Sequence, residues 1–401
     1  MFKRILVVVV ALSICGSLPA QESETDRRLK ELQRQIDILT QEIEALKTPQ
    51  AETKPVAADV QQYGLGAAAS KVYRAQPGVS FGGYGEMIYQ NRERSQADTA
   101  DLLRAVLYTG YKFNDRILFN SELEVEHAST ESGGAVSMEF AYLDFLQKPS
   151  LNYRAGLVLL PIGLINEQHE PTAYLGARRP EVERRIIPAT WGELGAGAFG
   201  DTHNISYRAY VVTGLDAAHF DSEEGIREGR QAGGEALAED WAVVGRADWH
   251  PFEGTIFGAS LYSGNSGQTQ NFSGRVTLGE IHSDAKFRGL SLRALYARGS
   301  VGDAARINAA NGLTGDESIG KSFGGWYTEA GYTMDRFTPY ARYEQVDTQR
   351  SVPAGFERNP ENNQNIWTLG VAFKPISQTV IKVDYQNTGA NQWNIAVGYI
   401  F

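Results

Sequence analysis

One stretch of the sequence gathers charged side chains between prolines, and these charges could act as an electrostatic filter. Residues 161–193 read PIGLINEQHEPTAYLGARRPEVERRIIPATWGE and also carry many apolar side chains. A long loop with its own hydrophobic groups usually packs against something, and charges at a narrow point select the ions that pass. The candidate constriction residues are Arg178, Arg179, Glu181, Glu183, Arg184 and Arg185. The alternative is an external loop with solvated charges.

The spacing of the histidines gives little support to catalytic or metal chemistry. No two of them have metal-ligand spacing on one element; they are His127, His169, His203, His219, His250 and His282. His127 and Ser129 share a strand face, but no acid or asparagine joins them in a matching motif. We therefore expect no enzyme activity, no metal and no cofactor.

From Gly78 onward, alternating apolar and polar residues indicate the elements that would position the charged stretch. Period two is the repeat of a β-strand. The candidate strands are 79–90, 101–113, 116–127, 135–147, 150–159, 192–200, 203–213, 240–250, 253–263, 274–287, 290–299, 322–334, 337–347, 364–374, 377–387 and 391–401. Short turns alternate with long polar loops, which is typical of an outer-membrane barrel.

Charged residues within the strands fall on one face of this alternation. Charges in mid-strand are costly in a dry core and comfortable beside the water of a channel. The candidate lumen-facing residues are Arg116, Glu122, Glu124, Glu126, Lys382 and Asp384. The expected fold is therefore all-β, a sixteen-stranded antiparallel transmembrane β-barrel preceded by a short N-terminal coiled-coil helix.

The chain ends within a strand, NQWNIAVGYIF, with Phe401 as its last residue. Apolar residues fall on every second position from Trp393 to Phe401. We expect this strand to pair with the first one, because an open sheet edge cannot be satisfied in lipid.

Three segments precede the expected barrel at 78–401. Residues 1–20 have Lys3 and Arg4 before an apolar run, which predicts a signal peptide that would remove Cys15, the only cysteine. The mature chain would then have no disulfide and no thiolate metal site. In residues 22–47, successive apolar residues are 3, 4, 3, 4 and 3 positions apart. This spacing favours a coiled coil over a single docked amphipathic helix. Residues 48–77, rich in Pro, Ala and Gly, are predicted to form a linker.

Overall composition does not separate a soluble protein from a membrane barrel. The mean hydropathy is −0.32, but the alternation of a barrel also averages to such values. The formal net charge is −10 without a basic stripe, so we expect no nucleic-acid partner.

Four stretches together resemble the phosphate-selective porin O/P-like family. They are VSFGGYGEMIY (79–89), YKFNDRILFNSELEVEHA (111–128), YRAGLVLLPIGLINEQHEP (153–171) and RRIIPATWGELGAGAFG (184–200). The resemblance implies a homotrimeric porin in the outer membrane of a Gram-negative bacterium, with the N-terminal helix in the periplasm. It also implies that Phe401 is a signal to the barrel assembly machinery.

The resemblance implies passive diffusion of ions or small hydrophilic solutes, with anions among the candidates. Residues 78–401 hold 28 Lys and Arg against 39 Asp and Glu, and only six of the bases are lysines. A steep phosphate preference needs a concentrated positive field at the narrowing, so the prediction is a porin without an assigned solute. The alternative function is an outer-membrane anchor whose coiled coil tethers the barrel to the cell wall.

Overall fold

The computed structural model of the 401-residue chain describes residues 28, 30–38, 61–93, 97–128, 134–388 and 391–401. The chain divides into two compact units, Met1–Lys54 and Pro55–Phe401. In the first unit, residues 28 and 30–38 are helical, and Leu32 and Ile36 of the expected coiled-coil seam are exposed. The other seam positions and the expected signal peptide lie outside the described residues. No helix in the described part of the chain has the length and apolar character needed to cross a membrane.

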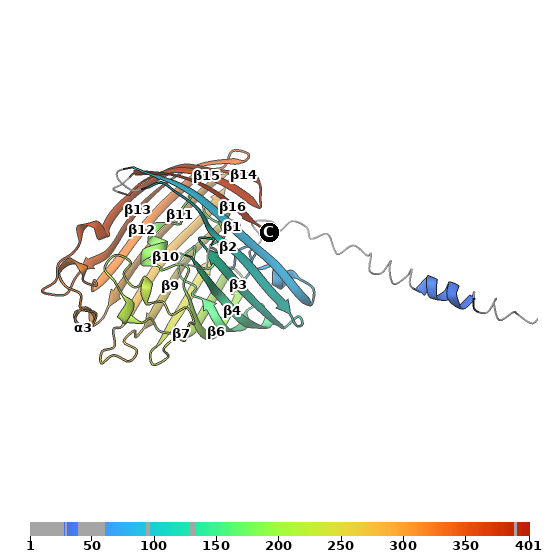
Figure 1. The fold of residues 1–401 in the computed structure, drawn as a ribbon, viewed down its shortest axis with the longest axis horizontal. Coiled ribbons are helices and arrows are strands. Elements are labelled where there is room, and N and C mark those ends of the chain that lie inside the picture. Colours follow the sequence, from blue (N-terminus) through green and yellow to red (C-terminus); the bar gives the residue numbers. More distant parts are fainter. Residues whose placement is uncertain (1–27, 29, 39–60, 94–96, 129–133, 389–390) are drawn as a thin grey trace, which may run out of the picture. The chain divides into compact units, whose positions relative to one another are not determined.

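The second unit contains a closed barrel of sixteen strands, which confirms the expected fold class (Figure 1). All neighbouring strands are antiparallel, and β1 pairs with β16 to close the barrel. The strands are β1 (Gly78–Arg92), β2 (Thr99–Lys112), β3 (Ile117–Glu126), β4 (Ala135–Lys148), β5 (Leu151–Leu159), β6 (Gly192–Thr202), β7 (Ile205–Thr213), β8 (Trp241–Trp249), β9 (Thr255–Gly264), β10 (Val276–Phe287), β11 (Leu290–Val301), β12 (Ser322–Tyr332), β13 (Phe337–Ser351), β14 (Asn363–Ile376), β15 (Thr379–Asn387) and β16 (Asn391–Ile400). The sixteen predicted ranges match these strands and differ from them by a few residues at the ends.

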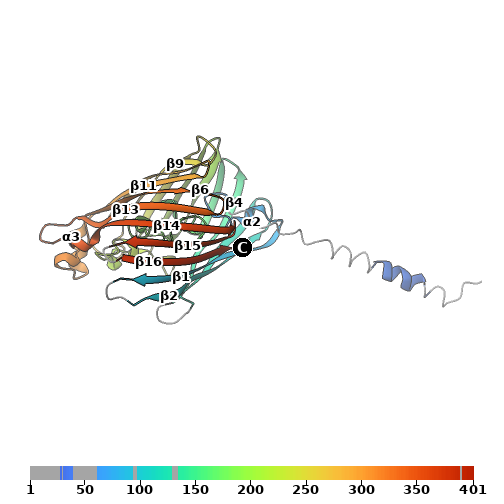
Figure 2. The same cartoon turned by 90° about the horizontal axis from the view of Figure 1, so that it is seen from above.

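The connections give the barrel a turn end and a loop end (Figure 2). The start of β1 and the end of β16 lie at the turn end, together with the short connections. The long connections meet at the loop end and include η2 (Ala217–His219), η3 (Arg227–Gly229), α3 (Ala304–Ala310), η4 (Gly315–Glu317) and η5 (Pro360–Asn362). Two further helices, α2 (Lys71–Arg74) and the π-helix η1 (Val182–Ile186), belong to segments that pack against the inner wall.

The outer wall is apolar and carries two belts of aromatic side chains. In β16, Trp393 and Ile395 are exposed, whereas Asn394 between them is buried on the inner face. The loop-end belt includes Trp241, Trp326, Trp367 and Trp393, and the turn-end belt includes Trp249, Phe287, Tyr332, Phe337 and Phe401. An apolar band between aromatic girdles is the surface of a barrel that spans a membrane.

Residues 61–75 fall within the expected linker, but they pack against the inner wall near the turn end. Asn120 of β3 donates to the carbonyl oxygen of Ala69 at 3.0 Å, and the Tyr73 hydroxyl donates to Asp144 of β4 at 2.6 Å. A Cβ at Gly110 of β2 would lie 2.5 Å from the side chain of Val72, so the segment approaches the wall at bare backbone. The linker prediction is therefore wrong for these residues, because small side chains here allow close packing.

Phe401 completes the seam between the last strand and the first. Its backbone N–H donates to the Gly83 carbonyl at 2.9 Å, and its carbonyl accepts from the Gly83 N–H at 3.1 Å. Deleting Phe401, or replacing it with Asp, should lower the amount of heat-modifiable folded barrel in outer membranes. The deletion removes both hydrogen bonds, and Asp puts a charge on the lipid-facing row. Phe401→Tyr should fold normally; normal folded levels of the first two variants would contradict the closing role.

Candidate functional site

The inner loop (residues 160–191) joins β5 to β6 and folds into the barrel. Its apolar side chains form part of the core, and those of Ile162, Ile165, Val182, Ile186 and Trp191 are fully buried. Asn166 ties the two ends of the loop together. Its amide nitrogen donates to the carbonyls of Leu160 and Trp191 at 2.8 and 3.0 Å, and its amide oxygen accepts from the Trp191 N–H at 2.6 Å. The loop therefore lies in the lumen rather than outside the barrel.

Glu183 anchors the inner loop both to itself and to the barrel wall. Its carboxylate accepts from the N–H groups of Leu164 and Ile165 at 2.8 and 2.7 Å, and from the hydroxyl of Tyr327 in β12 at 2.6 Å. Gly163 turns the backbone around this carboxylate with φ of 74°, and a Cβ there would lie 2.6 Å from Glu183 Oε2. Burial raises the pKa of Glu183, although the hydrogen bonds from Tyr327 and Ile165 oppose this rise.

Side chains from distant strands hold the rest of the loop. His169 Nε2 lies 2.9 Å from Glu122 of β3, and the Ala177 N–H donates to Asp384 of β15 at 2.6 Å. Lys382 of β15 donates to the Gly176 carbonyl at 2.8 Å. Three of the candidate lumen-facing residues, Glu122, Lys382 and Asp384, therefore project inward, where they bind the inner loop instead of facing open water.

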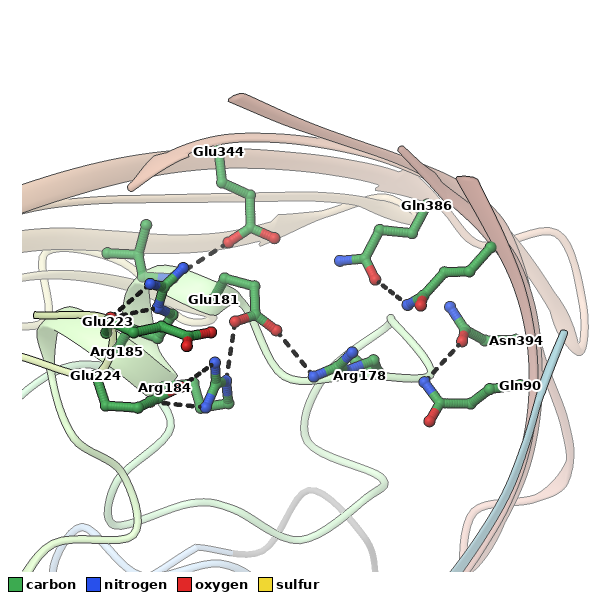
Figure 3. Close-up of polar contacts among 12 residues, drawn as sticks. Gln90, Arg178, Glu181, Arg184, Arg185, Glu223, Glu224, Glu344, Gln386 and Asn394 are labelled. Carbon is green, nitrogen blue, oxygen red and sulfur yellow. Dashed lines mark hydrogen bonds and ion pairs between the residues drawn. The ribbon is translucent and has the colours of Figure 1, made fainter. Parts of the chain in front are cut away.

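Three of the candidate constriction residues form one charged group (Figure 3). Glu181 lies between Arg178 and Arg184, with nitrogen–oxygen distances of 3.1 and 2.8 Å. Burial would raise the pKa of Glu181, but the two guanidinium groups outweigh it and lower this pKa to about 2. The arginine side chains keep about a third of their surface exposed, whereas Glu181 is buried. Glu224 also pairs with Arg184 at 2.8 Å, so the group holds two arginines and two acids, and the arginine side chains are its most exposed members.

Other predicted site residues lie elsewhere. Arg185 is buried, and its Nε donates to the Glu223 carbonyl at 3.1 Å. This hydrogen bond joins the inner loop to the connection between β7 and β8. Arg116 is exposed in the turn before β3, which starts one residue later than expected. Glu124 is buried on the inner face and pairs with Arg104 at 3.3 Å. Glu126 is half-buried at the loop end of β3.

Two recesses with charged side chains in their linings open on opposite sides of the inner loop. The loop-end recess has a volume of about 490 Å³, and the turn-end recess has a volume of about 420 Å³. Tyr174 lines both recesses. Its hydroxyl donates to Glu86 of β1 at 2.7 Å, and Lys382 Nζ lies 3.6 Å from its ring centroid. Tyr174 therefore lies where the two recesses adjoin.

Basic residues outnumber acidic residues around both recesses. The loop-end recess is lined by Arg92, Arg104, Arg178, Arg179 and Arg184 against Glu86, Asp101 and Glu181. The turn-end recess is lined by Lys286, Arg288, Arg293, Arg336 and Lys374 against Asp284, Glu329 and Asp335. The wall beside Arg178 carries neutral amides, where Gln90 donates to Asn394 at 3.2 Å (Figure 3).

Sequence reasoning missed Tyr174 and Arg104, which line these recesses. Strand parity could have indicated Arg104, because it shares the inward face of β2 with Val106 and Tyr108. No local pattern marks Tyr174, because its place depends on contacts with β1 and β15.

The comparisons with known proteins agree with the barrel. No protein-family model matches the chain. A curated relative, an uncharacterized protein of Aquifex aeolicus, is 38% identical over 341 residues, which are 80% of this chain and 78% of the relative. Among solved structures, OmpT in its trimer form, an outer membrane protein of Vibrio cholerae, has a TM-score of 0.51 at 13% identity. Salmonella typhi OmpF in complex with daunomycin has a TM-score of 0.51 at 12% identity. The matches cover 80% of this chain and 99% and 97% of those chains; such identities show a shared fold alone.

Proposed function

We propose that this chain, which belongs to the same family as the Aquifex aeolicus protein, is an outer-membrane channel for passive diffusion of ions or small hydrophilic solutes. The observation that carries this proposal is the pair of recesses, both lined by charged side chains and by Tyr174, inside a closed barrel. A girdled apolar wall around a polar interior suits a water-filled passage through lipid. In this proposal the inner loop is the constriction, as loops with charged side chains are in selective pores.

The sequence resemblance supports the wider setting of the channel. We place the barrel in the outer membrane of a Gram-negative bacterium, with its loop end outward and the N-terminal helix in the periplasm. Assembly there involves the barrel assembly machinery, with Phe401 as its signal, and three copies form a homotrimer.

The charges around the recesses favour anions over cations. Five basic and three acidic residues line each recess, although acids exceed bases in residues 78–401 as a whole. Low-dielectric walls focus the field of charges at a narrow point. Charges that line the recesses therefore affect ion selectivity more than charges on the outer loops do. We therefore propose anionic solutes as the preferred class.

Removing positive charge from the loop-end recess should reverse this preference. In a planar bilayer with a KCl gradient, Arg178→Gln together with Arg179→Gln and Arg184→Gln should lower the chloride-to-potassium permeability ratio from above one to below one. Glu181→Gln should raise the ratio, because it removes the acid between two arginines. The exposed turn-end changes Arg116→Gln and Lys148→Gln serve as the matched control and should leave the ratio unchanged. An unchanged ratio in the triple variant would place these arginines off the ion path.

The filled lumen favours a second candidate function. The inner loop and residues 61–75 both pack within the barrel. In this second function the lumen is closed to solutes, and the barrel is an anchor that the N-terminal coiled coil tethers to the cell wall. Single-channel recording of the purified full chain separates the two functions. Discrete conductance steps support the channel, whereas a silent bilayer that contains folded barrel supports the anchor.

A further inference from the structure

We propose that the outer wall over β10–β13 binds a membrane lipid with a phosphorylated headgroup, in the leaflet around the loop end. This inference rests on the membrane placement proposed above, and it concerns a surface that does not line the channel. Four exposed basic residues, one on or next to each of four adjacent strands, form what we call the basic rim: Arg275, Arg298, Lys321 and Arg350. The rim lies beyond the loop-end aromatic belt, where lipid headgroups are expected.

The basic rim differs from several arginines inside the barrel, which are paired with acids. Arg342, for example, is fully buried beside Glu344 at 2.9 Å. Among the residues that the structure describes, none of the four rim bases forms an ion pair, and the nearby Asp347 pairs with Arg358 at 2.7 Å. The acids of η4 are also exposed, but they form no ion pair with the rim in the described part of the chain. The rim thus keeps its positive charge available for an external anion.

Two of the rim arginines lie next to a stretch of bare backbone. A Cβ at Gly324 of β12 would lie 3.4 Å from Arg298 Cα and 3.4 Å from Arg350 Cδ. Gly324 therefore places no side chain between the two arginines. Guanidinium groups bind phosphate oxygens through paired, charge-assisted hydrogen bonds, so this pair suits a phosphate group.

An apolar hollow of about 630 Å³ lies on the wall below the rim. Its floor consists of small residues on three strands, where Ser283 pairs with Ala294, and Ala294 with Thr328. Its sides include Phe257, Ile281, Tyr296 and Trp326, which are exposed on the outer face. Ala294 is four residues from Arg298, or about 13 Å along the strand. An acyl chain that descends from a headgroup at the rim would therefore reach the hollow.

The two features together identify a lipid rather than free phosphate. Inorganic phosphate could use the rim but would leave the hollow empty. A neutral lipid could fill the hollow but would leave four bases without an anion. A lipid with acyl chains and a phosphorylated headgroup of net negative charge satisfies both parts of the surface.

Native mass spectrometry of the detergent-solubilised full chain tests the proposal, with diphosphoryl lipid A as the probe. Arg298→Gln with Arg350→Gln should weaken lipid A binding at least about tenfold, since each base near a membrane surface contributes to anionic-lipid attraction. Ala294→Trp, which fills the hollow, should also weaken binding. The turn-end control, Arg116→Gln with Lys148→Gln, should bind like the unchanged protein. Phosphatidylethanolamine should bind all forms equally weakly, because its own ammonium group balances the charge of its single phosphate.

Equal lipid A affinity in the rim variant and the unchanged protein would overturn the proposal, as would an equal loss in the turn-end control. Displacement of lipid A by inorganic phosphate would show a free-phosphate site instead. If Ala294→Trp binds lipid A with unchanged affinity, the hollow is not part of the binding site. Single-channel conductance should be the same in all these variants, because none of the changed residues lines the recesses. Loss of lipid binding is thereby distinguished from failure of the channel function.

Discussion

Replacing Glu183 with alanine should release the inner loop and raise single-channel conductance, while the barrel stays folded. The change leaves the N–H groups of Leu164 and Ile165 and the hydroxyl of Tyr327 without their acceptor in a buried site. Leaving such groups unpaired costs about 1–3 kcal/mol each, so the folded-in position of the loop should be destabilised by roughly 3 kcal/mol or more. The strand ladder is independent of this contact, so heat-modifiable mobility should remain.

Limited proteolysis would report the release directly. Trypsin should cleave the Glu183→Ala variant after Arg178, Arg184 or Arg185, and these sites should be protected in the unchanged protein. Glu183→Gln serves as the control, because its amide oxygen still accepts from the backbone, and its loop should remain largely protected. Equal protection and equal conductance in Glu183→Ala would show that other contacts suffice to hold the loop.

Replacing Tyr174 with alanine should join the two recesses and increase conductance severalfold. The ring stands between them, held by Glu86 and Lys382. Tyr174→Phe keeps the ring and loses only the hydroxyl, so its conductance should stay near that of the unchanged protein. This contrast separates loss of the ring from loss of the hydrogen bond. If the alanine variant conducts like the unchanged protein, the path does not pass Tyr174.

The strands and their faces were predictable because each rests on a local pattern. The alternation in 377–387 places Lys382 and Asp384 on one face, and both point inward in β15. The apolar content of residues 161–193 favoured a loop that packs, and the inner loop does pack inside the barrel. These features depend on the pleat of a strand or on composition, which a single sequence carries.

The roles of individual loop residues were not predictable, because they depend on distant partners. Glu181 and Glu183 are two residues apart, yet Glu181 pairs with Arg178 and Arg184, while Glu183 binds Tyr327 across the lumen. Neither role follows from charge or spacing within the loop. Residues 61–75 were misassigned for the same reason. Their small side chains resemble a linker, and only the inner wall and Glu170, which accepts from Ala68 and Ala69, reveal their packing.

Thiol modification at position 174 tests the central claim, that ions pass between the two recesses at this residue. Cys15 lies in the expected signal peptide, so Tyr174→Cys would give a mature protein with a single thiol. A positively charged methanethiosulfonate added during single-channel recording should block or sharply reduce the current. The same reagent should have no effect on Tyr142→Cys, whose site is covered by Tyr73 of the segment 61–75. A current through Tyr174→Cys that persists unchanged after complete modification, verified by mass spectrometry, would contradict the account.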